Sequence, residues 1–167
     1  SKPMFEGLDM RGVGLTDAAM TWGVIARMKE VTDMNIVIKG VEVGADAALA
    51  VQFGADAIWV SNHGGRQMDS APATLDVLPA IVDAVGDQVE VWLDGGIRSG
   101  QDVLKALALG AKGTMIGKSF LYGLGAMGEA GVTTCLDIIA RELDLTMAFC
   151  GRRDITEIDS SIIWRGP

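Results

Sequence analysis

Residues 57–69 read Ala57-Ile58-Trp59-Val60-Ser61-Asn62-His63-Gly64-Gly65-Arg66-Gln67-Met68-Asp69. The first four residues form an apolar run that predicts a buried strand, and the paired glycines predict a turn after its end. The turn contains His63, the only histidine in the chain, and Arg66 lies three residues further on. The stretch therefore places a titratable base and a permanent cation beside the end of a strand.

This pair suits a substrate that carries negative charge and must lose a proton. An imidazole accepts protons near neutral pH, and a guanidinium group matches the two oxygens of a carboxylate. The alternative is a structural histidine whose nitrogens are satisfied within the turn. The other strand ends of the chain favour the catalytic interpretation.

Short apolar runs alternate with helical patterns on both sides of this stretch. Strands are expected at residues 35–39, 57–61, 89–93 and 114–116. Helices are expected at residues 22–31, 45–53, 75–85 and 99–109, and in a long final segment that ends at Gly151. Strands that alternate with helices are typical of parallel βαβ units, so the sequence predicts an α/β fold with a parallel sheet.

Polar or glycine-rich groups follow each of the four expected strands. These groups are Lys39; Ser61 with His63 and Arg66; Asp94, Gly95, Gly96, Ile97 and Arg98; and Gly117 with Lys118. The loops after parallel strands gather at one edge of the sheet. The four groups therefore predict one site.

Two of the four groups suit a phosphate. The glycines in Asp94–Arg98 allow close approach of the backbone, and Ser99 with Asp102 predicts a capping box for a helix that starts near Gly100. The N–H groups of that helix are expected to point toward the phosphate. Gly117-Lys118 opens the final helix in the same way and adds a cation. The alternative is two ordinary glycine turns.

Composition limits the class of protein. The chain has 167 residues, of which 49% are hydrophobic, and this is enough for one sizeable core. A net charge of −8 argues against nucleic acid as a partner. No apolar run reaches the length of a membrane span, so the expected location is the cytoplasm or the cytoplasmic face of a membrane. Residues 1–20 are expected to be a loop lead-in, and residues 21–167 the folded unit.

Four stretches together resemble the FMN-dependent 2-hydroxy-acid oxidase and dehydrogenase family, which includes glycolate oxidase, lactate oxidase or dehydrogenase, and mandelate dehydrogenase. The stretches are Ile38-Lys39-Gly40, Ser61–Asp69, Asp94–Arg98 and Leu107–Tyr122. The similarity runs from about Trp22 to Gly151. Ser-Asn-His-Gly-Gly-Arg-Gln is the most specific of these motifs, because inosine monophosphate dehydrogenase and other phosphate-binding barrels share the Asp-Gly-Gly-Ile-Arg motif.

The resemblance implies a role for each site residue. His63 would be the catalytic base, and Arg66 would bind the substrate carboxylate. Lys39 would lie beside the pyrimidine edge of the flavin, with Ser61 nearby. The remaining FMN-binding residues would be Asp94, Gly95, Gly96, Ile97, Arg98, Gly117 and Lys118. The implied reaction is oxidation of an (S)-2-hydroxy acid to the 2-oxo acid, with the electrons passed to FMN.

The chain departs from the family in two ways. Lys118 stands where the family usually has arginine, so weaker FMN binding is expected. Four strands cannot close an eight-stranded barrel, and they match the C-terminal half, strands five to eight, of a TIM (β/α)8 barrel. A companion N-terminal half-barrel is therefore expected, with the complete barrel forming a homo-oligomer. Two alternatives stay open, namely another phosphate-binding barrel enzyme and a non-catalytic half-barrel that acts as an assembly module.

Overall fold

The computed structural model describes residues 20–164, and its elements follow the predicted order. The expected lead-in at residues 1–20 lies outside this range except for Met20. The strands are β1 (Val37–Val41), β2 (Ala57–Val60), β3 (Glu90–Leu93) and β4 (Gly113–Thr114). The α-helices are α1 (Gly23–Val31), α2 (Gly44–Gln52), α3 (Thr74–Val85), α4 (Gly100–Ala108) and α5 (Lys118–Phe149). Short 3-10 turns are η1 (His63–Gly65), η2 (Ile155–Glu157) and η3 (Ser160–Ile162).

The four strands form one sheet in the order β1-β2-β3-β4, and every neighbouring pair is parallel. The predicted parallel α/β arrangement is confirmed. β1 begins two residues later than expected. The N–H of Ile36 donates to the Asp56 carboxylate at 2.6 Å, so this N–H is bonded to a side chain and not to a neighbouring strand.

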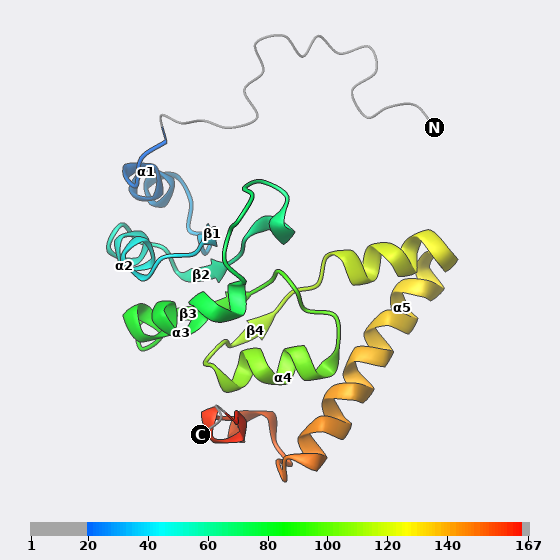
Figure 1. Cartoon of the computed structure of the whole chain (residues 1–167). Coiled ribbons are helices and arrows are strands. Elements are labelled where there is room, and N and C mark those ends of the chain that lie inside the picture. Colours follow the sequence, from blue (N-terminus) through cyan, green and yellow to red (C-terminus); the bar gives the residue numbers. More distant parts are fainter. Residues whose placement is uncertain (1–19, 165–167) are drawn as a thin grey trace, which may run out of the picture.

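Helices cover one face of this sheet (Figure 1). α2 and α3 pack on the strands and bury the side chains of Ile58 and Val60 in β2 and of Val91 and Leu93 in β3. Side chains alternate between the two faces of a strand. Trp59 and Trp92 therefore lie on the opposite face, and both are only partly buried. The sheet thus has a helix-covered outer face and an inner face that carries two tryptophans.

α5 consists of two arms that meet at a bend. Met127 (φ −142°) and Gly128 (φ 61°, ψ −139°) leave the helical conformation, and the chain reverses direction there (Figure 1). The arms pack with almost no side chain between them, since a Cβ atom added to Gly123 would lie 2.5 Å from the carbonyl oxygen of Gly131. The second arm then runs along α4. None of the helices in residues 20–164 is long and apolar enough to span a membrane.

Asp56 joins α1 to the start of the sheet. Its carboxylate pairs with Lys29 and accepts a hydrogen bond from the Ile36 N–H, and these contacts hold the pKa of Asp56 below its usual value. A carboxylate with a lowered pKa in the folded state stabilises the fold above its unfolded pKa, near 4, and loses this contribution as the pH falls through the folded value.

Asp56→Asn is therefore expected to lower the free energy of unfolding at pH 7 and to change it much less at pH 3. Urea unfolding at the two pH values measures the difference. Asp87→Asn is the control, because Asp87 is an exposed carboxylate away from this contact. Equal losses at both pH values for Asp56→Asn would contradict the assignment.

Candidate functional site

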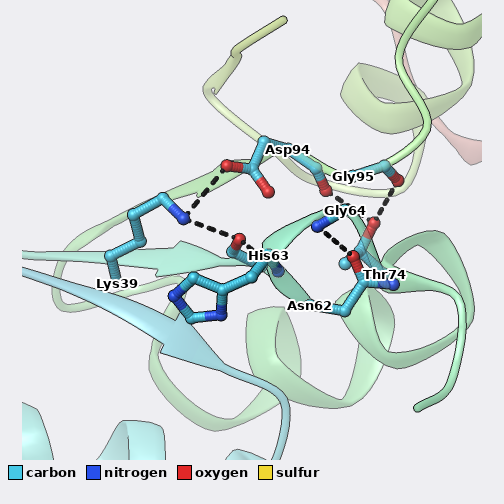
Figure 2. Close-up of polar contacts among 8 residues, drawn as sticks. Lys39, Asn62, His63, Gly64, Thr74, Asp94 and Gly95 are labelled. Carbon is cyan, nitrogen blue, oxygen red and sulfur yellow. Dashed lines mark hydrogen bonds and ion pairs between the residues drawn. The ribbon is translucent and has the colours of Figure 1, made fainter. Parts of the chain in front are cut away.

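Polar side chains from β1 and from the ends of β2 and β3 meet at the carboxyl edge of the sheet. The Nζ of Lys39 donates a hydrogen bond to the Oγ of Ser61 at 2.9 Å and lies 3.3 Å from the Oδ2 of Asp94 (Figure 2). Ser61 is completely buried, and its Oγ also accepts from the His63 N–H at 3.1 Å. Three strand ends that are far apart in the sequence thus form one hydrogen-bonded cluster.

His63 lies beside this cluster in an unusual backbone conformation. Its φ is 55°, in the left-handed region, where residues other than glycine are uncommon and often belong to functional sites. Its imidazole packs on Gly40, where an added Cβ atom would lie 2.8 Å from the ring carbon Cε1. His63 is nevertheless an exposed residue. His63 is therefore held by the β1 backbone and remains open to a ligand.

Asn62 organises the loop that carries His63. Its Oδ1 accepts from the Gly64 N–H at 3.0 Å, and its Nδ2 donates to the Pro72 carbonyl at 3.1 Å. Arg66 follows as the residue that ends η1, and its side chain is exposed. Within residues 20–164, the Arg66 guanidinium makes no ion pair. It is therefore available to an anion.

Thr74 fixes the next loop and was missed by the sequence reasoning. Its buried hydroxyl contacts the carbonyl oxygens of Asp94 at 2.6 Å and Gly95 at 2.8 Å (Figure 2). Gly95 also packs on Asn62, since a Cβ atom added there would lie 2.7 Å from the Asn62 Oδ1. A threonine at the start of a helix gives no sequence signal of such a role, because the contact depends on a strand end 20 residues away.

The glycines expected to receive a phosphate leave open space. Atoms of the described residues approach no closer than 4 Å to a Cβ added at Gly96 or Gly117. Gly117 is the residue before α5, and no side chain caps the first turn of that helix. The Nζ of Lys118 donates to the Gly64 carbonyl at 3.3 Å, so Lys118 links this end of the site to the His63 loop.

The start of the helix near Gly100 differs in part from the expectation, because its Gly100 N–H does not point to a free site. The predicted capping box of Ser99 and Asp102 is present, and Asp102 accepts hydrogen bonds from the backbone N–H groups of Arg98 at 3.0 Å and Ser99 at 3.1 Å. The Gly100 N–H donates to the Glu142 carboxylate at 2.9 Å. The two carboxylates therefore accept from three N–H groups at the start of α4, whereas no side chain caps the first turn of α5.

Ile97 and Arg98, the last two residues of the expected phosphate loop, differ in exposure. The side chain of Ile97 is 6% exposed and belongs to the hydrophobic core, so only its backbone can face a ligand. Arg98 is exposed. The cluster at the strand ends therefore contains Lys39, Ser61 and Asp94, with His63 beside it and the Gly96, Gly117 and Lys118 backbone nearby.

The arrangement supplies a base, three cations (Lys39, Arg66 and Lys118) and two glycine-lined loops at one edge. No group of three His, Cys, Asp or Glu side chains that could hold a metal occurs in residues 20–164. A hollow of about 680 Å³ lies elsewhere, between α3, the α4–β4 loop and the segment around Ile155. The candidate site itself is an open sheet edge that suits an anionic ligand and proton transfer.

Comparison with known proteins gives a family and a partial length. The family described as FMN-dependent dehydrogenase matches residues 6–165, which extends beyond the predicted similarity at both ends. 2-Hydroxyacid oxidase 1 of Mus musculus is 48% identical over 151 residues, covering 90% of this chain and 41% of that protein. Glycolate oxidase of Spinacia oleracea is 46% identical over 165 residues, covering 97% of this chain and 45% of that protein.

A solved structure of the monotopic membrane protein (S)-mandelate dehydrogenase superposes with a TM-score of 0.86 at 36% identity. The superposition covers 90% of this chain and 40% of that one. The chain spans about two fifths of the length of the relatives it matches.

Proposed function

The chain belongs to the FMN-dependent dehydrogenase family, and on that premise we propose that residues 21–167 are the C-terminal half, strands five to eight, of an FMN-binding (β/α)8 barrel. The complete barrel oxidises an (S)-2-hydroxy acid to the 2-oxo acid. The observation that carries this proposal is the convergence of Lys39, Ser61 and Asp94 at the strand edge, with His63 beside them.

The site residues fit FMN. The Oδ1 of Asp94 is buried without a hydrogen-bond partner in the described part of the chain, and a buried acceptor of this kind needs a donor such as a ribityl hydroxyl. Gly95, Gly96, Ile97 and Arg98 contribute the loop around the ribityl chain and phosphate. The phosphate is received at Gly117 and Lys118, where the uncapped first turn of α5 offers N–H groups to an anion.

Each polar residue then has a role toward the substrate or cofactor. FMN, when bound, accepts the two electrons of the oxidation. His63 takes the substrate proton, since it is the exposed base at this edge. Arg66 binds the carboxylate, and Lys39 places positive charge beside the flavin. The substrate class follows from the names of the relatives, which are oxidases or dehydrogenases of glycolate, lactate, mandelate and 2-hydroxy acids.

Anaerobic spectroscopy tests this function. The complete protein is expected to show a flavin spectrum that is bleached by (S)-lactate, glycolate or (S)-mandelate. (R)-Lactate and (R)-mandelate should leave the flavin oxidised. A protein without flavin, or a flavin that stays oxidised with all three acids, would refute the proposal.

Arg66→Lys is expected to weaken binding of the 2-oxo acid product about tenfold. Lysine keeps the charge but loses the second arm of a bidentate contact, and hydrogen bonds to charged groups contribute about 1.5–3 kcal/mol each. Titration of the flavin absorbance gives the affinity. Arg153→Lys, a substitution at an exposed position outside the site, is the control. Equal affinities of wild type and Arg66→Lys would show that Arg66 does not bind the carboxylate.

The barrel also needs a second set of strands. β1 and β4 are the outer strands of the sheet in residues 20–164, so each has one edge without a neighbour. Unpaired backbone groups at strand edges and a water-exposed inner face of the sheet are unfavourable. Closure of the sheet into a barrel removes both. The remaining four strands are supplied by another segment or a companion chain, and the complete barrel forms a homo-oligomer.

Native mass spectrometry is expected to find FMN only in particles that contain this additional polypeptide. Size-exclusion chromatography with flavin detection gives an independent measurement. A monomer of the 167-residue chain that binds FMN and oxidises a hydroxy acid would contradict the half-barrel architecture.

A further inference from the structure

One row of side chains crosses the inner face of the sheet at a single level. The strand register places Lys39 beside Trp59, Trp59 beside Trp92, and Trp92 beside Gly113. Side chains at the same level on neighbouring parallel strands point to the same face. Ser61 and Asp94 lie two residues after Trp59 and Trp92, directly past the ends of β2 and β3, so they form the next level at the carboxyl edge.

Within this row, Lys39 lies over the aromatic face of Trp59. The Nζ of Lys39 is 5.2 Å from the centre of the Trp59 ring, within the range in which a cation is attracted to an indole. Trp59 in turn contacts Trp92 edge to face, with ring centres 6.4 Å apart and planes inclined at 70°. The Nε1 of Trp92 donates to the Glu90 carboxylate at 2.8 Å. Glu90 therefore orients Trp92, whose contact with Trp59 is between the two rings and does not involve the indole N–H.

The ring adds something that Ser61 and Asp94 do not provide. An ammonium group has three N–H donors, and the contacts with Ser61 and Asp94 engage two of them. A cation over an aromatic face is stabilised without a hydrogen bond, so the third donor stays available to a ligand. The Trp59 ring also packs against the Lys39 side chain. It therefore limits the conformations that the flexible methylene chain of Lys39 can adopt.

We propose that Trp59 is a positioning residue for Lys39. The indole face holds the ammonium at the level of Ser61 and Asp94 and leaves one N–H directed to the cofactor. This inference rests on the proposed function, in which Lys39 lies beside the flavin. The contact between Lys39 and Trp59 is independent of that function.

The test uses the complete barrel with three variants. Trp59→Leu removes the aromatic face, Trp59→Phe retains one, and Trp92→Phe removes an indole from the same row without direct contact to Lys39. The first readout is the NMR shift of the Lys39 Cε protons, identified by their absence in Lys39→Met and measured with and without FMN. The second readout is the midpoint potential of bound FMN, which a fixed cation beside the flavin raises.

Trp59→Leu is expected to abolish the upfield ring-current shift of these protons and to move the flavin potential to a more negative value. Trp59→Phe should keep most of the proton shift and most of the wild-type flavin potential. Trp92→Phe should change neither the proton shift nor the potential. An unchanged potential in Trp59→Leu, or an unchanged proton shift, overturns the positioning role. If wild type binds no FMN, the proposed function fails, and the proton shift alone then decides whether Trp59 holds Lys39.

Discussion

His63→Gln is expected to slow reduction of the flavin by about 10²- to 10⁴-fold, the usual contribution of a general base. Glutamine retains hydrogen-bonding groups and a similar size but cannot accept a proton. FMN should stay bound, because the glycines and Lys118 expected to receive its phosphate do not depend on the His63 side chain. Stopped-flow absorbance with a saturating hydroxy acid measures the rate of reduction.

Met68→Gln provides the matched control for this substitution. Met68 is an exposed residue of the same loop. The control should therefore reduce its flavin at the rate of wild type. Reduction of His63→Gln at a rate close to that of the control would exclude His63 as the base.

Gly40→Ala is expected to slow the same step about 100-fold although it changes the chemistry of no reacting group. The methyl group would lie 2.8 Å from the Cε1 of His63, so the imidazole must move, and a displacement of about 1 Å can cost that factor. The backbone adds a second effect. Gly40 has a φ of 94°, and an alanine there is expected to destabilise the fold by about 1–3 kcal/mol.

Gly54→Ala separates the two effects. Gly54 has a similar φ of 102°, but its added methyl would meet only the flexible Lys29 side chain, at 3.4 Å. Both variants should lose comparable stability in urea, and only Gly40→Ala should slow flavin reduction. Equal rates in the two variants would mean that the β1 backbone does not position His63.

The sequence predicts the order of elements well because each apolar run is followed by glycine or by a polar or charged residue. Asn62 and Gly64 illustrate why the turn after β2 is predictable, since the bond between them spans two residues. The Ser99 capping box is equally local, and it occurs where expected. Features formed within a few residues can be recognised from spacing alone.

Other features depend on residues that meet only in the folded chain. Glu142 reaches the Gly100 N–H across 42 residues, and the spacing of residues around Gly100 does not predict this contact. The bend in α5 requires Gly123 to meet Gly131, which neither glycine reveals in the sequence. The aromatic support of Lys39 likewise requires the register of three strands. Such contacts carry no periodic signal, so sequence patterns do not predict them.

The bend at Met127–Gly128 also limits how far the chain reaches. A straight helix of 32 residues would be about 48 Å long, well beyond the roughly 30 Å diameter of a small domain. Because the helix folds back, its first residue, Lys118, touches the Gly64 carbonyl while Glu142, near its other end, caps α4. A single helical segment thereby contacts both the carboxyl edge of the sheet and the start of the neighbouring helix, and so fixes the spacing between them.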